Sequence, residues 1–187
     1  MAGAEPGGGG GRLKLRSVCL HGPESTGKST IAPRLAKHFE TRCVAEFGRT
    51  YCEAYGVDLT MADLLAIAHA HDAKAKAAIE SDDHPVILDT DPLMTAVWAD
   101  MLFGRRDPWF DRWRDYADLY LLFDIDLPWE ADGTRMFGTD EARRRFFDRC
   151  RAELERRGVP YALVSGRGEQ RYMNAVRAIE RAMREAA

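Results

Sequence analysis

Residues 22–29, with the sequence Gly-Pro-Glu-Ser-Thr-Gly-Lys-Ser, decide how this chain folds. They follow an apolar run at residues 13–20, which we predict to be a strand, and they open a helical pattern that ends near Phe39. The two glycines let the backbone turn tightly and approach a polyphosphate closely. Backbone N–H groups and the positive end of the following helix then hold the negative charge. The pattern Gly-x-x-x-x-Gly-Lys-Ser in this setting predicts a phosphate-binding P-loop.

The P-loop predicts ATP or GTP, together with Mg²⁺, as cofactors. Lys28 is expected to contact the β- and γ-phosphates, and the Ser29 hydroxyl is expected to bind Mg²⁺. A GTPase switch is disfavoured, because the sequence has no Asn-Lys-x-Asp segment to recognise guanine. The residues predicted to contact the nucleotide are Gly22, Glu24, Ser25, Thr26, Gly27, Lys28, Ser29 and Thr30.

The composition sets limits on partners and location. The chain has 187 residues, enough for one domain with a buried core, and its net charge of −3 gives no general attraction to nucleic acid. No stretch approaches the roughly 20 apolar residues of a membrane span. Four scattered cysteines are typical of reduced thiols in a cytoplasmic protein. We therefore expect a cytoplasmic protein with a small-molecule substrate; the sequence does not indicate its oligomeric state.

Short apolar runs alternate with longer helical patterns, which predicts an α/β fold. We expect a three-layer P-loop sandwich with a parallel sheet of about five strands and a lid. Residues 1–11 are predicted to form a disordered Gly-rich tail, residues 12–187 the domain, and residues 126–145 roughly the lid. After the first strand and its helix, the predicted strands are 41–47, 85–88, 119–123 and 161–164, and the main predicted helices are 60–80, 92–104, 140–157 and 171–186.

Two acidic residues at predicted strand ends are candidates for catalysis. Asp89 ends an apolar run, as in the Walker B pattern, and is expected beside the P-loop because parallel strands end at one sheet edge. It could bind Mg²⁺ or act as the base. Glu46 ends the second predicted strand and could bind sugar hydroxyls or accept a proton. A capping role for Asp89 and a solvated position for Glu46 are the alternatives.

Two arginines of the predicted lid are candidates for stabilising transition-state charge. Arg135 lies in an irregular stretch, and Arg143 lies three residues before Phe146 on the apolar face of the next helix. An arginine-rich helix face exposed to solvent is the alternative for Arg143.

The substrate side is less well defined by the sequence. Residues 48–51 are predicted to form a loop, Asp91 is predicted to cap the helix that begins at Pro92, and one or two tryptophans could stack on a flat cationic ring. Core packing is the alternative for the tryptophans. The residues predicted to contact the substrate are Glu46, Arg49, Tyr51, Asp91, Trp98 and Trp129.

Four segments, 22–29, 46–51, 88–91 and 132–135, occur together with Trp129 and with Arg143 and Phe146. Through these residues the chain resembles the nicotinamide riboside kinase domain of bacterial NadR-type proteins over residues 16–179. The resemblance implies transfer of the γ-phosphate of Mg-ATP to the 5′-hydroxyl of nicotinamide riboside, giving nicotinamide mononucleotide. Larger members add DNA-binding and adenylyltransferase domains, so neither of those activities is expected here. This chain departs from the family at His71, where members often have Gln, and at Thr134, where they often have Leu.

Two alternatives to this function stay open at the level of sequence. The same scaffold could phosphorylate another nucleoside or small metabolite. A regulatory module could instead bind ATP and a pyridine nucleotide without catalysis. The sequence contains Lys28, Ser29, Asp89 and the lid arginines, which together favour an enzyme. A module that only binds its ligands would not need the lid arginines.

Overall fold

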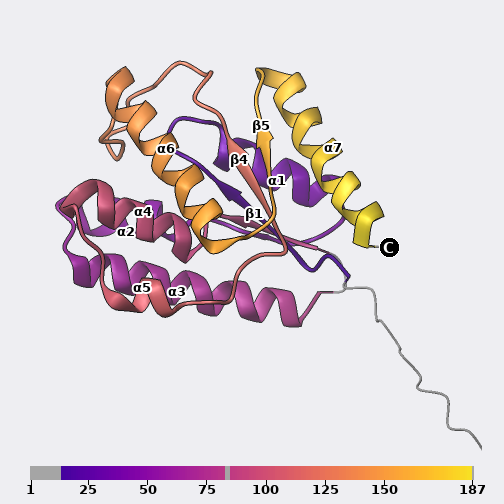
Figure 1. Ribbon diagram of the computed structural model, residues 1–187, viewed down its shortest axis with the longest axis horizontal. Coiled ribbons are helices and arrows are strands. Elements are labelled where there is room, and N and C mark those ends of the chain that lie inside the picture. The colour runs from indigo at the N-terminus through magenta and orange to yellow at the C-terminus, as the bar shows by residue number, and fades with distance from the viewer. Residues whose placement is uncertain (1–13, 83–84, 187) are drawn as a thin grey trace, which may run out of the picture.

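Five parallel strands form the centre of the computed structural model, which describes residues 14–82 and 85–186 (Figure 1). Their spatial order is β2-β3-β1-β4-β5, and every neighbouring pair is parallel. The predicted parallel α/β sheet is confirmed, whereas the predicted tail at residues 1–11 lies outside the described residues. The strands are β1 (Ser17–His21), β2 (Cys43–Val44), β3 (Val86–Asp89), β4 (Leu119–Phe123) and β5 (Tyr161–Val164).

Helices cover both faces of the sheet (Figure 1). The side chains of β1 to β4 alternate between two cores: Leu121 packs with α1 and α7, whereas the neighbouring Leu122 packs with α4 and α6. A third apolar cluster joins α2, α3, α4 and α5. The helices are α1 (Lys28–His38), α2 (Phe47–Tyr55), α3 (Met61–Glu80), α4 (Pro92–Phe103), α5 (Pro108–Arg112), α6 (Asp140–Arg157) and α7 (Gly168–Ala186).

The register of the sheet brings two of the predicted functional segments to one edge. Leu20 of β1 pairs with Asp89 of β3, so the P-loop that follows β1 and the acid that ends β3 lie together. In this strand order, β1 lies between β3 and β4, where the direction of the crossovers reverses. Open α/β sheets bind ligands at that switch point, beyond the carboxyl ends of the strands.

Two helix starts follow the signals in the sequence. Thr60 and Asp63 form a capping box at α3, in which Asp63 Oδ2 accepts from the Thr60 N–H at 2.8 Å. Asp91 caps α4 by accepting from the Leu93 N–H at 2.9 Å, with Pro92 in the first helical turn. Each cap defines where its helix begins, and α4 begins directly after β3 at the sheet edge.

The segment after β2 differs from the prediction. The strand ends at Val44, and Glu46 is the N-cap residue of helix α2, so residues 48–51 lie on a helix and the predicted loop was wrong. Helix α2 contains Gly48, and no side chain forms a capping hydrogen bond at its N-terminus. Each of these features weakens an isolated helix. Phe47 packs against the cluster shared with α3 and α4, and this tertiary packing stabilises a helix that local propensity does not predict.

The predicted lid, residues 126–145, consists of an irregular segment followed by the beginning of α6.

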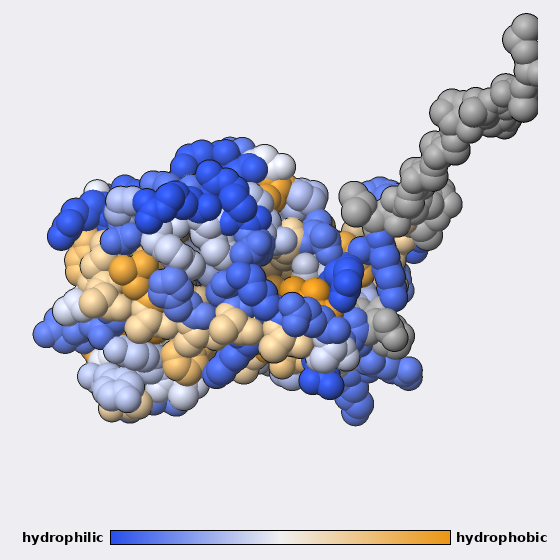
Figure 2. Space-filling model, turned by 90° about the horizontal axis from the view of Figure 1, so that it is seen from below, coloured by the Kyte–Doolittle hydropathy of each residue, from blue (hydrophilic) through white to orange (hydrophobic). Residues whose placement is uncertain are grey.

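Figure 2 views the molecule from below and shows hydrophilic and hydrophobic residues intermixed over that face. Among the helices of the described residues, none is both long and apolar enough to cross a membrane.

Candidate active site

The P-loop has a backbone conformation that only glycine tolerates at two positions. Gly22 has a φ of 132°, and a Cβ atom there would lie 2.8 Å from the Phe123 carbonyl oxygen. Gly27, which precedes α1, has a φ of 85°. Both angles lie in the left-handed region, where other residues are strained. The loop therefore forms an open backbone cradle at a helix N-terminus, which fits a polyphosphate.

Lys28 lies at the centre of this cradle. Its side chain is buried, and Nζ donates to the Gly22 and Pro23 carbonyl oxygens at 2.7 Å each. Thr26 reinforces the turn by donating to the Pro23 carbonyl oxygen at 2.8 Å. The ammonium group is thus held at the mouth of the loop, where an anionic phosphate would meet it.

Asp89 is the carboxylate that lies beside the P-loop, and it is 3% exposed. Within the described residues, its Oδ1 atom has no hydrogen-bond partner. Burial raises the pKa of this carboxyl, whereas the Lys28 ammonium and the Ser29 hydroxyl act in the opposite direction. Mg²⁺ prefers oxygen ligands of this kind, a carboxylate with a neighbouring hydroxyl. The site therefore fits Mg²⁺, with Asp89 and Ser29 as candidate ligands.

Two cavities meet at the sheet edge. The first, the P-loop cavity, is lined by residues 24–30 of the loop and of α1. The second, the lateral cavity, extends between α2, α3 and α4. A ligand in the P-loop cavity would therefore be in direct reach of one in the lateral cavity. Six residues line both: Glu24, Glu46, Arg49, Met94, Trp98 and Arg135.

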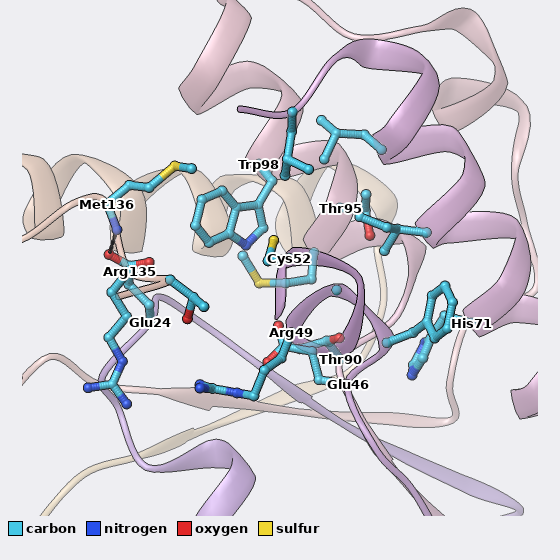
Figure 3. Close-up of a pocket in the computed structure, with 17 residues that line it drawn as sticks. Glu24, Glu46, Arg49, Cys52, His71, Thr90, Thr95, Trp98, Arg135 and Met136 are labelled. Carbon is cyan, nitrogen blue, oxygen red and sulfur yellow. Dashed lines mark hydrogen bonds between the residues drawn. The ribbon is translucent and has the colours of Figure 1, made fainter. Parts of the chain in front are cut away.

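The lateral cavity has polar groups along its sides and different groups at its two ends. In Figure 3, Trp98 lies on one side and Glu46 and Arg49 lie on the other. Arg135 lies at the end next to the P-loop, and His71 lies at the opposite end. A flat ring between these sides would have an aromatic surface and a carboxylate within reach, an arrangement that suits a cationic ring.

Glu46 and Glu24 are the two carboxylates that line both cavities, and Glu24 is engaged by the Met136 and Phe137 N–H groups. Burial raises the pKa of the Glu46 carboxyl, and the neighbouring Asp89 charge acts in the same direction. The Lys28 and Arg49 charges act in the opposite direction. A carboxylate whose pKa is raised towards neutrality is a better proton acceptor at working pH than an ordinary one.

The segment predicted to be the lid is attached to the P-loop by a carboxylate of the loop itself. Glu24 Oε1 accepts from the Met136 and Phe137 backbone N–H groups at 2.8 Å and 2.6 Å. The Arg135 guanidinium lies 3.3 Å from Ser25 Oγ and forms an ion pair with Asp132 at 3.1 Å. These contacts place Arg135 over the P-loop cavity.

Arg143 has a different position from Arg135. Its buried guanidinium donates to the Leu127 carbonyl oxygen at 2.7 Å and lies 3.4 Å from that of Ile125. It lines neither cavity. The structure therefore places Arg143 at the base of the lid, where it holds the backbone that leaves β4.

A family described as an AAA domain matches residues 17–171. The chain belongs to this AAA domain family. The "Trifunctional NAD biosynthesis/regulator protein NadR" of Escherichia coli (strain K12) is 28% identical over 180 residues, which cover 91% of this chain and 43% of that protein. The chain thus spans less than half the length of this curated relative.

Solved structures share the fold of this AAA domain. A crystal structure of NadR protein in complex with NR aligns with a TM-score of 0.75 at 23% identity, covering 92% of this chain and 52% of that chain. Thymidylate kinase from Ehrlichia chaffeensis aligns with a TM-score of 0.66 at 13% identity, covering 89% and 100%. The predicted P-loop kinase fold and the resemblance to NadR-type proteins are confirmed. The kinases among these proteins agree with the predicted phosphotransferase class.

Three of the residues predicted to contact the substrate line neither cavity of the AAA domain. Tyr51 donates to Asp63 Oδ1 at 2.5 Å, which ties α2 to the start of α3. Asp91 is buried, caps α4 and accepts from the Tyr120 hydroxyl at 2.5 Å. Trp129 lies within the lid segment. The structure brings only Glu46, Arg49 and Trp98 of the predicted set into the lateral cavity.

Several residues that line the lateral cavity were not among the predicted site residues. The spacing of Leu64, Ile67 and His71 on one face of α3 indicates packing as readily as ligand binding. His69, two residues before His71 on the same helix, is exposed, whereas His71 is buried. The other lining residues that were missed are Phe47, Gly48, Cys52, Leu59, Thr90, Met94, Thr95, Thr134 and Met136.

Proposed function

We propose that this chain transfers the γ-phosphate of Mg-ATP to the 5′-hydroxyl of nicotinamide riboside, giving nicotinamide mononucleotide. The observation that carries the proposal is the continuity of the P-loop cavity with the lateral cavity, through residues such as Glu46, Trp98 and Arg135. The NadR relatives, named for NAD biosynthesis, and the NadR structure in complex with NR support this choice of acceptor.

The P-loop residues position the donor. Mg-ATP, when bound, supplies a γ-phosphate whose charge is partly neutralised by the metal ion. Backbone N–H groups of the loop and the Lys28 ammonium bind the phosphates, and Asp89 with Ser29 would hold the metal. The remaining loop residues predicted to contact the nucleotide line the same cavity, apart from Gly22, which shapes the turn.

We assign the base to Glu46. Its carboxylate faces both cavities, whereas Asp89 lines neither of them and lies beside Ser29. An acceptor hydroxyl at the junction of the cavities would therefore meet Glu46 before it met Asp89. The raised pKa of Glu46 makes its ionised form a stronger proton acceptor.

The lid completes the site. We treat residues 126–145 as the lid, with Arg135 acting on the charge that develops on the transferred phosphoryl group. Arg143 acts indirectly, because it holds the base of the lid and does not line either cavity. Closure of the lid over the P-loop would also exclude water, which competes with the acceptor for the phosphoryl group.

The lateral cavity gives the acceptor ring its place. The Trp98 indole offers an aromatic face, and Glu46 adds a negative charge on the opposite side. A pyridinium ring carries a positive charge, so both groups favour it over a neutral ring. A cytoplasmic location belongs to the same proposal and is supported by four free cysteines among the described residues.

The test is ADP release from Mg-ATP with nicotinamide riboside, adenosine, cytidine, deoxyadenosine and ribose as separate acceptors, with the product mass confirmed. Turnover with nicotinamide riboside at a kcat/KM well above the others supports the proposal. Turnover with another nucleoside replaces the acceptor and keeps the phosphoryl-transfer mechanism. Binding of ATP and nicotinamide riboside without ADP release would overturn catalysis in favour of a regulatory module.

A further inference from the structure

His71 is a buried polar side chain at the end of the lateral cavity away from the P-loop. It is 3% exposed, and it lies across the cavity from Arg135 and Glu24 (Figure 3). Within the described residues, neither ring nitrogen has a hydrogen-bond partner of good geometry. The nearby Ala45 carbonyl oxygen can accept from one ring nitrogen at most. At least one nitrogen is therefore left for a ligand.

The surroundings of His71 are apolar. Leu64 and Ile67 lie seven and four residues before it on the same face of α3, and both are buried. Phe47 of α2 and Leu59 line the same cavity. Water is poorly accommodated in such a place, so an unpaired imidazole nitrogen gains most from a ligand that hydrogen-bonds to it.

The protonation state of His71 defines what such a ligand must offer. Burial lowers the pKa of His71 to about 4, and the Lys74 charge acts in the same direction. The Asp72 carboxylate and the Ala45 carbonyl act in the opposite direction. The ring is therefore neutral near pH 7, with one N–H donor and one nitrogen acceptor. A neutral group that can accept and donate fits it, and an ionised carboxylate can only accept and must also be desolvated.

We propose that His71 selects the acceptor by hydrogen-bonding to an uncharged polar group on its ring, of the carboxamide kind. The guanidinium groups of the lateral cavity do not compete for this task, because Arg49 and Arg135 both pair with Asp132, at 2.9 Å and 3.1 Å. The inference rests on the proposed function and adds a specificity-determining residue to it. Acceptors with a bare ring, or with a carboxylate in place of the carboxamide, are poor substrates.

The experiment compares kcat/KM for three acceptors: nicotinamide riboside, nicotinic acid riboside and pyridine riboside, which lacks the ring substituent. The unchanged protein should prefer nicotinamide riboside over each of the others by about tenfold to a hundredfold, the usual range for losing one partner of a buried hydrogen bond. His71→Leu should reduce the preference over pyridine riboside to about twofold or less, through the acceptor KM, with the ATP KM unchanged. His71→Gln, which keeps a donor and an acceptor, should retain most of it.

The matched control is His69→Leu, a histidine on the same helix whose exposed ring packs against Trp109 at 4.3 Å between centroids. It should leave all three kcat/KM values unchanged. Equal use of the three acceptors by the unchanged protein overturns the inference, as does a preference that survives His71→Leu. Where His71→Leu does not fold, the acceptor ratios of the unchanged protein and of His71→Gln decide the matter.

The same variants separate this inference from the proposed function. If adenosine or cytidine is the acceptor and nicotinamide riboside is not, the proposed function fails. In that case an increase of about tenfold or more in the nucleoside KM of His71→Leu, at unchanged ATP KM, still supports His71 as the residue that reads the ring. An unchanged nucleoside KM overturns it.

Discussion

The P-loop cavity and the lateral cavity share six lining residues but are built in different ways. The P-loop cavity is made mainly by one continuous stretch, residues 24–30, whose backbone N–H groups and single ammonium group suit a constant ligand, the polyphosphate. The lateral cavity is made by side chains from α2, α3, α4 and the lid. Changes in the first should therefore lower turnover with every acceptor, whereas changes in the second should alter which acceptor is used.

The largest effect tests the constant half of this comparison. Lys28→Ala removes the ammonium group at the mouth of the loop, and we expect kcat to fall by about a hundredfold or more with any acceptor. The apolar cores do not depend on this side chain, so the melting temperature should change little. Steady-state ADP release and a thermal melt measure both quantities.

The control for this variant is Lys37→Ala, in the last turn of the same helix, where the side chain is exposed. It should retain the full rate. A near-normal rate for Lys28→Ala would remove the basis for a catalytic P-loop. A rate loss confined to one acceptor would break the comparison between the cavities.

Glu46 lies at the junction of the two cavities, and Glu46→Gln tests the assignment of the base. We expect kcat to fall by about a hundredfold to ten thousandfold, with little change in ATP affinity. Because the base acts in its ionised form and its pKa is raised, the rate of the unchanged protein should fall as pH drops through a value above the ordinary range of Glu. This acid limb should be absent from the pH profile of Glu46→Gln.

Asp89→Asn separates the metal role from the base role. Its buried carboxylate lies beside Ser29, so the variant should need a higher Mg²⁺ concentration for half-maximal rate. If Asp89→Asn instead abolished the acid limb at unchanged Mg²⁺ dependence, the base would have to be reassigned to Asp89.

A smaller effect is expected at the lid. Arg135→Ala should lower kcat by about tenfold to a hundredfold and weaken ATP binding much less, because a lid arginine acts mainly on transition-state charge. Its guanidinium also pairs with Asp132, so Arg135→Lys keeps the charge and reports on the loss of that geometry. Binding of ATP measured by calorimetry, beside kcat, distinguishes the two effects. An equal loss in both would assign Arg135 to ground-state binding.

The difference between the cavities also explains what the sequence could predict. The P-loop, the end of β3 at Asp89 and the cap at Asp91 are local patterns, in which neighbouring residues define the structure. The predictions of these features were confirmed by the structure. The parallel sheet followed from the alternation of short apolar runs and helices.

The lateral cavity could be predicted only in part, because it depends on how distant elements pack. Glu46, Arg49 and Trp98 were expected to face a substrate, yet α2, which carries Arg49, was expected to be a loop. His71 was noted only as a departure from the family, and nothing in its sequence neighbourhood indicates that its ring nitrogens lack partners. Those facts arise from the packing of α3 on α2 and α4, which no local signal encodes.

The smallest effect on activity is expected at Asp91. This residue is close in the chain to residues that line the cavities, but it lines neither cavity itself. Burial raises the pKa of its carboxyl to about 6, from an ordinary value of 3.8. The folded state therefore favours the protonated form, and this stabilisation is fully present below about pH 4 and is lost as pH rises through about 6. One pKa unit corresponds to about 1.36 kcal/mol, so the loss of stability between the two pKa values is about 3 kcal/mol.

Asp91→Asn stays neutral over this pH range and remains a good helix cap for α4. The difference in unfolding free energy between the variant and the unchanged protein should therefore change with pH between about 4 and 6, in favour of the variant as pH rises. Taking the difference cancels the contributions of Glu46, Asp89 and His71, which both proteins share. Acceptor KM should change by less than about twofold, since a single hydrogen bond to substrate would cost more than that. A tenfold rise in acceptor KM, with a stability difference that does not change with pH, would instead make Asp91 a substrate contact. It would extend the lateral cavity to the N-terminus of α4.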